Sequence, residues 1–324
     1  MGMLTKKIER DLEELKNYKI GVLKGGISEE RKISLISGRE VFLALKRKGL
    51  DAEEIEINTS DEHTIEEILL ANNIEIAFIA LHGEFGEDGQ IQKILEGIDI
   101  PYTGSGPEAS YLAMDKIASK RLFLENNVLT PDFYIIHKDK VASPLSFPKV
   151  IKPYYSGSSI GVFIVDDIKA WDKSINKAFE ISDRLIIEEY IRGREITVGI
   201  LDDKPLSVIE IVPKEGYFDF TTKYSDALAE FKAPAPLNKD TYKKVMEMAE
   251  RAHRCLGCRH FSRVDIRLDN YNNPFVLEVN SIPGLTSHSL LPLSAKVCGI
   301  DFDNLIMRML ISALKNEKKA KQKV

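Results

Sequence analysis

Strand-like and helix-like segments alternate over the first hundred residues, and this alternation restricts the fold more than any other feature of the chain. Short apolar runs predict three buried strands, at 18–26, 51–57 and 74–83. Apolar residues at helical spacing predict a helix after each strand, at 29–49, 60–73 and 87–99. Such alternation is typical of a parallel sheet with helices on both faces, which binds ligands at the carboxyl ends of its strands.

Local signals in this region sharpen the prediction. Within the second helical segment, Thr64 and Glu67 have the spacing of a capping box. The glycines at 25–26 and the pair His82–Gly83 stand at the carboxyl ends of predicted strands. The segment before Tyr18 has the spacing of a short, exposed amphipathic helix.

A second kind of pattern begins at Gly104. A helix is expected from about Glu108, and residues 148–165 read as a strand, a glycine- and serine-rich turn and a second strand. A pair of strands is expected on either side of Gly193. The remaining predicted elements are a helix at 238–257 with Asn238 as its N-cap, strands at 262–269 and 274–280, and a last helix that ends at Leu314 before a solvated tail.

Polar residues interrupt the apolar strand at 274–280. Alternate residues of a strand point to the same face, so Glu278 and Asn280 share one face. By the same rule, Asp265 and Arg263 share a face of the neighbouring strand. Carboxylate and amide oxygens from adjacent strands suit a hard divalent cation, and Mg²⁺ takes few protein ligands when phosphates and water supply the rest. The sequence therefore predicts a magnesium site here.

Basic residues lie upstream of this acidic cluster. Lys152 ends a predicted strand, and the loop "YYSGSSIG" that follows could bring backbone N–H groups to phosphates. Lys116 is a second candidate cation. Two unit charges about 4 Å apart interact by roughly 4 kcal/mol at an effective dielectric of about 20, so carboxylates alone would repel a triphosphate. The two clusters make chemical sense together, around a magnesium-bound triphosphate.

Two shorter motifs suggest other functions. The segment "GSGPEA" at 104–109 matches a dinucleotide-binding glycine pattern, but no acidic residue ends a next parallel strand where the ribose contact would be. The segment "GSSIG" matches a serine hydrolase elbow at Ser159, with Asp265 and His288 following in the required order. That elbow leads into a helix, whereas "VFIVDD" has a strand pattern, so the hydrolase is the weaker alternative.

Composition limits the remaining possibilities. The 324 residues carry a net charge of −5, so a broad nucleic-acid footprint is not expected. No apolar run approaches the roughly 20 residues that span a bilayer, and no apolar core of a secretory signal is evident. An odd, small number of cysteines (Cys255, Cys258 and Cys298) fits a reducing cytoplasm. Cys255 continues the apolar stripe of its helix, which favours a core cysteine over a redox or zinc site.

Seven segments in chain order closely resemble the D-alanine–D-alanine ligases, a family of the ATP-grasp superfamily. They are "LKGGISEERKISLISG", "LHGEFGEDGQIQ", "PYTGSGPEASYLAMDK", "IKPYYSGSSIG", "RGREITVGIL", "FSRVDIRLD" and "LEVNSIPGLTSHS". The resemblance runs from about Tyr18 to Leu314, and the elements "HG-x-x-GEDG" and "PG-x-TSHS" are its most specific parts.

The resemblance implies a three-domain α/β ATP-grasp fold. Its parts would be an N-terminal parallel-sheet domain at 1–103, a central subdomain at 104–187 with the phosphate loop, and a C-terminal subdomain at 188–324 with the catalytic site. The implied ATP contacts are Lys116, Lys152 and Ser159 for the phosphates, Glu188 for the adenine, Glu195 for the ribose, and Lys223 in the lid. Asp265, Glu278 and Asn280 would hold two Mg²⁺ ions, for which Mn²⁺ could substitute.

The implied reaction joins two D-alanines for peptidoglycan precursors. One carboxylate attacks the γ-phosphate of ATP to give an acyl phosphate, and the amine of the second D-alanine displaces phosphate. Arg263 and the N–H of Gly284 would stabilise the oxyanion. The implied substrate contacts are Glu30 for the first ammonium group, Ser289 and Leu290 for the second carboxylate, and His82. Glu30, Ser158 and Tyr224 would tie the glycine-rich loop and the lid to this site.

Some alternatives stay open within the same fold. A ligase that takes D-lactate or D-serine as its second substrate is the main one, although Tyr224 beside Lys223 favours the dipeptide-forming type. The resemblance also suggests a homodimer, with D-alanine and ATP as small-molecule partners and with no nucleic acid or membrane. The chain departs from the family pattern at Ser281, where a threonine is expected, and upstream of Lys223.

Overall fold

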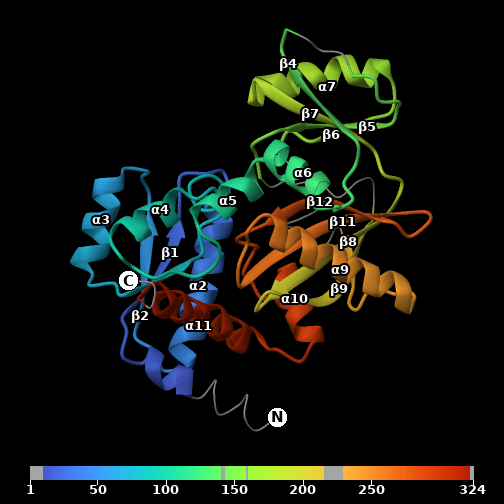
Figure 1. Cartoon of the computed structure of the whole chain (residues 1–324). Helices are drawn as coiled ribbons and strands as arrows, with labels where there is room; N and C mark the ends of the chain where they lie inside the picture. Colours follow the sequence, from blue (N-terminus) through green and yellow to red (C-terminus); the bar gives the residue numbers. More distant parts are fainter. Residues whose placement is uncertain (1–9, 140–142, 158–159, 215–228, 322–324) are drawn as a thin grey trace.

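The computed structural model describes residues 10–139, 143–157, 160–214 and 229–321, with side chains described up to Leu314. Its strands form three sheets of three, four and five strands (Figure 1). The three-stranded sheet is parallel and the other two are antiparallel. This arrangement confirms the predicted α/β class with a parallel N-terminal sheet. In Figure 1, the four-stranded central sheet forms an upper lobe above the other two.

The N-terminal sheet is covered on both faces, as the alternating pattern predicts. Its strands are β1 (Ile20–Gly25), β2 (Ala52–Ile57) and β3 (Ile76–Ile79) in the order β2-β1-β3, and its helices are α2 (Arg31–Arg47), α3 (Glu62–Ala71) and α4 (Gln90–Gly97). Val22 of β1 packs in one apolar cluster with Val41 of α2. Its neighbour Leu23 packs in another, with Ile65 of α3. Successive residues of one strand thus pack on opposite faces of the sheet.

Helix α3 begins three residues earlier than the capping box predicts. Asp61 is its N-cap, and the carboxylate accepts the backbone N–H of Thr64 at 2.9 Å. Thr64 is therefore already inside the helix, and the box of Thr64 and Glu67 is wrong. Aspartate and threonine both cap helices well, so local sequence did not choose between the two starts.

The central unit is an antiparallel sheet covered by α7. Its elements are α5 (Pro107–Met114), α6 (Lys116–Glu125), β4 (Phe133–His137), β5 (Lys149–Pro153), β6 (Phe163–Val165), α7 (Ile168–Ile181) and β7 (Arg184–Glu189), with strand order β4-β7-β5-β6. β5 and β6 pair antiparallel, which confirms the predicted hairpin. The helix expected from Glu108 breaks at Asp115, whose carboxylate accepts the N–H of Ile117 and Ala118 at 2.9 Å and so starts a new helix.

The third sheet has the order β10-β9-β8-β11-β12 and is antiparallel throughout. Its elements are β8 (Gly193–Leu201), β9 (Lys204–Pro213), β10 (Ala229–Lys232), α9 (Lys239–Cys255), β11 (Phe261–Asp269), β12 (Pro274–Asn280) and α10 (Leu290–Val297). Asn238 caps α9 by accepting the N–H of Thr241 at 2.9 Å, as predicted. Val245 of α9 packs with Val264 and Val279, so α9 buries one face of the sheet.

The two strands on either side of Gly193 are β7 and β8, but they do not pair with each other. β7 pairs with β4 and β5 in the central sheet, whereas β8 pairs with β9 and β11. The expected strand pair is thus wrong as a pairing. Residues 190–192 instead connect two separate sheets.

The C-terminal helix returns to the N-terminal sheet. α11 (Phe302–Lys321) lies beside α2 in Figure 1, and Leu310 shares an apolar cluster with Val41 and Ile20. Its helical backbone continues to Lys321, past the predicted end at Leu314. Residues 10–15 are helical, and Leu15 is fully buried in the same cluster, so the segment before Tyr18 is anchored rather than merely exposed.

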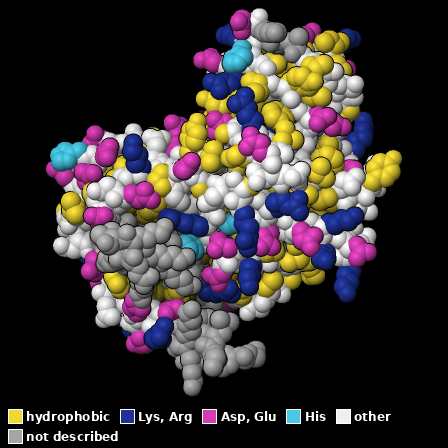
Figure 2. Space-filling view, viewed as in Figure 1, with side chains coloured by type: hydrophobic (Ala, Val, Ile, Leu, Met, Phe, Trp, Pro, Cys, Tyr) yellow, Lys and Arg dark blue, Asp and Glu magenta, His cyan; other side chains and the backbone are white. Residues whose placement is uncertain are grey.

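Basic and acidic side chains are intermixed on the face seen in Figure 2, so charge there is not of one sign. Within the described ranges, no helix combines the length and the apolar character needed to cross a membrane.

Candidate active site

Strands β11 and β12 bring the predicted metal ligands together. In their antiparallel register, Arg263 lies opposite Asn280 and Asp265 lies opposite Glu278. An irregularity follows, because Ile266 lies opposite Val276 and Leu277 has no partner of its own. This β-bulge changes the phase of the alternation, so that Leu277 and Glu278, although adjacent, both line the same cavity. Leu277, although apolar, therefore does not lie on the face of β12 that packs in the core.

Asp265 is the centre of a polar network on this face. Its Oδ1 accepts Nε of Arg263 at 2.9 Å and the hydroxyl of Thr197 at 2.7 Å. Its Oδ2 accepts Nη2 of Arg263 at 2.7 Å and Nδ2 of Asn280 at 3.1 Å. The side chain of Asp265 is 11% exposed, so protein donors replace most of the water around its carboxylate. Two neighbouring strands thus fix its orientation.

The donor set at this point consists of two carboxylates and one amide. Among the described residues, no group of three or more His, Cys, Asp and Glu side chains is arranged to hold a metal. Asp265, Glu278 and Asn280 instead offer a few oxygen ligands at the edge of a cavity. This set fits Mg²⁺, which prefers oxygen and completes its coordination with phosphates and water. It does not fit a metal that requires a complete cage of protein ligands.

Lys116 and Lys152 approach the same cavity from the central unit. Lys116 is the first residue of α6, and its ammonium group donates to the carbonyl of Ser156 and lies 3.7 Å from Oε2 of Glu278. Lys152 comes from β5. Both side chains line the cavity that also contains Asp265 and Glu278. The predicted acidic and basic clusters therefore face one another.

Glu188 lies behind Lys152 and is almost completely buried. Its Oε2 lies 2.6 Å from Nζ of Lys152 and its Oε1 lies 3.0 Å from Nζ of Lys120. Lys120 directs its hydrogen bonds to Thr130 and the carbonyl of Pro131, so Oε1 has an ion pair but no hydrogen bond. Burial disfavours the charge of Glu188, but the two lysines outweigh it and lower its pKa to about 2.

The two lysines respond differently to this pair. Burial lowers the pKa of Lys120 to about 8, because desolvation exceeds the attraction of Glu188. Burial also opposes the charge of Lys152, but Glu188 and the more distant Glu278 and Glu195 outweigh it, and the pKa of Lys152 is raised. Lys152 is therefore protonated and positively charged at neutral pH, and it lines the cavity.

The N-terminal domain contributes Glu30 and His82. Glu30 is the N-cap residue of α2 and is 8% exposed. A Cβ on Gly83 would lie 2.7 Å, and one on Gly157 2.9 Å, from Oε2 of Glu30, so both loops approach this carboxylate closely. His82 is buried, with Nε2 2.9 Å from the hydroxyl of Ser37. Glu30 thus lies where the N-terminal sheet meets the glycine-rich loop.

His82 also faces a carboxylate that was not predicted. Its Nδ1 lies 3.4 Å from Oε1 of Glu87, and burial raises the pKa of Glu87. Glu87 is the glutamate of the element "HG-x-x-GEDG", so a signal was present, although the sequence analysis gave this residue no role.

The turn after β12 brings Gly284 next to Ser289. A Cβ on Gly284 would lie 2.9 Å from Oγ of Ser289, which explains a glycine here. Ser289 is the N-cap residue of α10, Leu290 is its first residue, and Oγ of Ser289 accepts the N–H of Thr286 at 3.0 Å. These three predicted residues thus form one compact turn.

The cavity between the central and C-terminal sheets has an empty volume of about 810 Å³, its open mouth included. Six predicted residues line it: Lys116, Lys152, Glu188, Glu195, Asp265 and Glu278. Apolar side chains complete the wall, among them Val150, Val162, Ile164 and Leu277. Asn280 lines an adjoining small pocket that shares Lys116 and Glu278 with the cavity.

Arg267 also lines the cavity, although the sequence analysis did not single it out. A signal was present, because Arg267 follows Asp265 by two residues and so shares its face of β11. Its Nη1 lies 3.1 Å from Oε2 of Glu195.

Four predicted residues lie outside the part of the chain that the structure describes: Ser158, Ser159, Lys223 and Tyr224. The serine hydrolase alternative can still be judged from the flanking chain. After Gly161 the chain enters strand β6, whereas a nucleophile elbow leads into a helix. Asp265, which would serve the histidine in that alternative, is paired with Arg263. The local fold contradicts the hydrolase.

Comparisons with known proteins agree with this geometry. Residues 56–105 match the sequence model described as the D-ala D-ala ligase N-terminus, and residues 127–311 match the D-ala D-ala ligase C-terminus. The chain is 44% identical to a D-alanine–D-alanine ligase of Geotalea uraniireducens over 306 residues, covering 93% of this chain and 97% of that one. It is 43% identical to that of Methylacidiphilum infernorum over 291 residues, covering 90% and 94%.

Solved structures give the same result. A D-alanine–D-alanine ligase from Bacillus anthracis, complexed with ATP, superposes with a TM-score of 0.82 at 33% identity, covering 94% of this chain and 99% of that one. The VanG D-Ala:D-Ser ligase from Enterococcus faecalis superposes with a TM-score of 0.77 at 30% identity, covering 91% and 99%.

Two antiparallel sheets around a cavity with lysines on one side and a carboxylate pair on the other define an ATP-grasp enzyme. Within that class, the chain belongs to the D-alanine–D-alanine ligase family.

Proposed function

We propose that this enzyme joins two D-alanines into D-alanyl-D-alanine, for peptidoglycan precursors, at the expense of ATP. Family membership over 93% of the chain supports the reaction. The observation that carries it is the register of β11 and β12, which sets Asp265 opposite Glu278 at a cavity that Lys116 and Lys152 also line. The cavity can therefore accept a triphosphate together with its cation.

In this proposal, the lysines bind and orient the phosphates. Lys152 keeps its charge because its pKa is raised, and Lys116 lies between the glycine-rich loop and Glu278. Glu188 holds Lys152 in place through their ion pair and would contact the adenine, and Glu195 would contact the ribose. Ser159 and Lys223 would complete the contacts from the loop and the lid. Positioning of this kind supplies most of the catalysis in phosphoryl transfer.

Asp265, Glu278 and Asn280 are the residues that would hold Mg²⁺. The ion, when bound, neutralises phosphate charge and polarises the transferring group. We propose two such ions, for which Mn²⁺ could substitute, because Asp265, Glu278 and Asn280 offer few protein ligands, and Mg²⁺ takes the rest of its ligands from phosphates and water. The amide nitrogen Nδ2 of Asn280 donates to Asp265, which leaves the amide oxygen Oδ1 as the atom that would bind the cation.

The chemistry takes place next to Arg263. The carboxylate of the first D-alanine, whose ammonium group Glu30 would hold, attacks the γ-phosphorus and ADP leaves. The amine of the second D-alanine then attacks the acyl carbon and phosphate leaves. Asp265 holds Arg263 through two hydrogen bonds, which fixes a cation beside the tetrahedral oxyanion, with the N–H of Gly284 as a second donor.

The remaining assignments concern the second substrate and the loops. Ser289 and Leu290 would receive the carboxylate of the second D-alanine, on the N-terminal turn of α10, and His82 would be a further substrate contact. Ser158 and Tyr224 would tie the glycine-rich loop and the lid to Glu30. The close approach of Gly157 to Glu30 supports a contact at this point.

Larger-scale features are proposed on the family resemblance. We propose three domains at 1–103, 104–187 and 188–324, a homodimer, and a place of action in the cytoplasm. The sheets suggest two refinements of these boundaries. The central subdomain would extend to Glu189, because β7 ends there, and α11 would be counted with the N-terminal domain, because it packs on the N-terminal sheet. Light scattering would test the homodimer, and a monomeric mass would contradict it.

A second candidate function differs only in the second substrate. The VanG D-Ala:D-Ser ligase is a structural relative at 30% identity over 91% of this chain, so the fold also accommodates that specificity. D-lactate is the other such substrate. The 44% identity to a D-alanine–D-alanine ligase favours the dipeptide.

The decisive experiment measures ADP release with Mg²⁺-ATP and D-alanine alone, then with D-serine or D-lactate added, at pH 6 and 8, with mass identification of the product. We expect D-alanyl-D-alanine as the main product in every mixture at neutral pH. Glu278→Gln should abolish turnover, and unchanged turnover would remove this residue from the mechanism. A predominant mixed product would favour the second candidate.

A further inference from the structure

Arg267 places a positive charge at the cavity, which apolar side chains also line. It lies on the same face of β11 as Arg263 and Asp265, two residues beyond the carboxylate. Val150, Val162 and Leu277 line the same cavity. An arginine is costly to bury in such surroundings unless its donors are used. Its partners therefore indicate its role.

The first partner is Glu195, directly across the sheet. Arg267 lies opposite Glu195 in the register of β11 and β8, and Nη1 lies 3.1 Å from Oε2. The two side chains are 14% and 15% exposed, so the pair is largely shielded from water. Cross-strand neighbours hold each other in place, and a planar guanidinium limits the orientations that the carboxylate can take.

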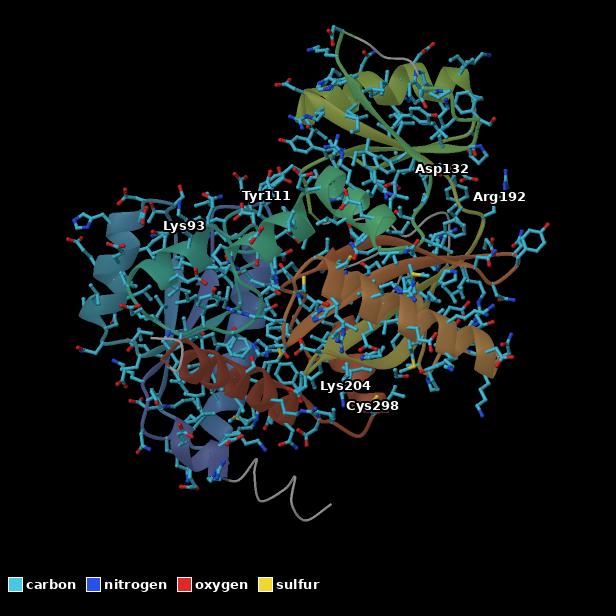
Figure 3. All side chains as sticks on the ribbon, in the orientation of Figure 1. Lys93, Tyr111, Asp132, Arg192, Lys204 and Cys298 are labelled. Atoms are coloured by element: carbon cyan, nitrogen blue, oxygen red, sulfur yellow. The ribbon has the colours of Figure 1, made fainter. Side chains whose placement is uncertain are left out.

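The other partners belong to the connection between the two sheets. Nε donates to the carbonyl of Ile191 at 3.2 Å, and Nη2 donates to the hydroxyl of Tyr190 at 3.1 Å and the carbonyl of Gly193 at 3.2 Å. The guanidinium also lies 5.3 Å from the centre of the Tyr190 ring. In Figure 3, the neighbouring Arg192 lies at the junction of the central lobe with the C-terminal sheet. One side chain thus holds both Glu195 and the connection 190–193.

We infer that Arg267 is a positioning residue that makes the cavity selective for nucleotides with an intact ribose, by holding Glu195 in reach of the ribose hydroxyl groups. The inference rests on the proposed function, in which Glu195 receives the ribose. A carboxylate has two oxygens and about four lone-pair sites, so Glu195 can accept from Arg267 and from ribose hydroxyls at once. A hydrogen bond to a charged group is strong only when geometry is good.

The chemical test compares ATP with 2′-deoxy-ATP, which lacks one ribose hydroxyl. Binding of each Mg²⁺-nucleotide is measured by titration calorimetry without D-alanine, so the result does not depend on ligase activity. Wild-type protein should bind ATP roughly tenfold or more tightly than 2′-deoxy-ATP, as expected for a hydrogen bond to a charged group. Arg267→Met, which keeps length but removes the donors, should weaken ATP binding and bring the ratio close to one.

Arg194→Met is a matched control. Arg194 precedes Glu195 on β8 and so points to the opposite face, where it pairs with Glu210 through Nε at 2.6 Å and Nη2 at 2.8 Å. Its loss should lower thermal stability but leave the ATP preference at the wild-type value. In the double variant Arg267→Met/Glu195→Ala, the ratio of the affinities for ATP and 2′-deoxy-ATP should equal that of Glu195→Ala alone. The two substitutions are then not additive, because both residues act through one contact.

Two results would overturn the inference. One is a wild-type protein that binds the two nucleotides equally. The other is a loss of affinity in Arg267→Met that is the same factor for both, which is the result of a merely structural role. Failure of the proposed function would look different, since it would show as absent D-alanine-dependent ADP release with nucleotide preference intact.

Discussion

Glu188 shows how single charges organise the nucleotide cavity. It is 1% exposed and lies between Lys120, which is fully buried, and Lys152, which lines the cavity. Two cations against one anion leave an excess of positive charge next to the site proposed for phosphates. Such charges are stable in a buried position only because each is paired. The local pattern of α6 does not distinguish Lys120 from a surface lysine, so its role emerges only from the fold.

Lys152→Ala is expected to raise the KM for ATP at least about tenfold, because it removes a charged contact made in both the ground state and the transition state. Steady-state kinetics with saturating D-alanine measures this. Lys149→Ala is the control, since Lys149 lies on the same strand but stacks 4.7 Å from the Trp171 ring, inside the central unit. An ATP KM that changes equally in both variants would contradict the assigned role.

Glu188→Gln tests the buried pair through its pH dependence. The pKa of Glu188 is lowered to about 2 from the ordinary 4.5, because Lys120 and Lys152 outweigh the effect of burial. A lowered carboxyl pKa stabilises the folded state above pH 4.5 and loses this effect as pH falls towards 2, which amounts to roughly 3 kcal/mol. Urea denaturation at pH 7 to 3 should show the difference between wild type and variant shrinking below pH 4.5. A constant difference would argue against the pair.

Cys255 at the end of α9 and Cys258 just after it behave as core thiols. Burial raises the pKa of Cys255 to about 11 and that of Cys258 to about 12. Both thiols therefore stay protonated at neutral pH, as expected of core cysteines.

At the scale of elements, the irregular points of the C-terminal sheet carry the site. The bulge after Asp265 directs both Leu277 and Glu278 toward the same cavity. Gly193 is the first residue of β8, where the chain leaves the central sheet. Gly193 has φ of 143°, and a Cβ there would lie 1.9 Å from the carbonyl oxygen of Leu268. Only glycine allows β8 and β11 to approach in this way.

Gly193→Ala is expected to destabilise the protein by about 2 kcal/mol or more, because the added methyl group meets backbone that cannot move aside. It should also weaken ATP binding, since Arg267 donates to the carbonyl of Gly193. Gly49→Ala is the control: its φ is 74°, but nothing lies within 4 Å of the added Cβ, so its cost should be limited to about 1–2 kcal/mol of backbone strain. Equal effects in denaturation would show that close packing at Gly193 does not matter.

At the scale of the whole molecule, the C-terminal helix packs against the N-terminal part of the chain. α11 follows the catalytic sheet in sequence but packs with α2 and the N-terminal sheet, and Leu15 joins the same apolar cluster. The N-terminal domain is thus held on the ATP-binding part by the last helix as well as by the direct connection. This keeps Glu30 in place at the glycine-rich loop.

Leu310→Ala is expected to cost about 2–5 kcal/mol, because Leu310 is fully buried in this shared cluster. Circular dichroism is the appropriate probe, since the one tryptophan, Trp171, lies in the separate central cluster and reports on that unit. Leu124→Ala, at a site that is 58% exposed, should change stability by less than about 0.5 kcal/mol. A small effect at Leu310 would show that α11 is dispensable for the N-terminal domain.

Much of the site was predictable because it depends on a local rule. Side chains alternate along a strand, so Arg263 and Asp265 could be placed on one face of their strand, and Glu278 and Asn280 on one face of theirs, without knowing the fold. The same rule would have found Arg267. Lys120 and Glu87 could not be recognised in this way, because their importance comes from partners at 188 and 82 that only the folded chain brings near.

The sequence by itself determined the strand–helix alternation, the family resemblance and the identity of the polar stripe on β11 and β12, since these rest on periodicity and residue type. The tertiary structure alone decided that β7 and β8 join different sheets and that a bulge brings Leu277 and Glu278 to the same cavity. The physical reason is that strand pairing and register minimise the free energy of contacts between distant segments, whereas alternation and capping signals report only on near neighbours.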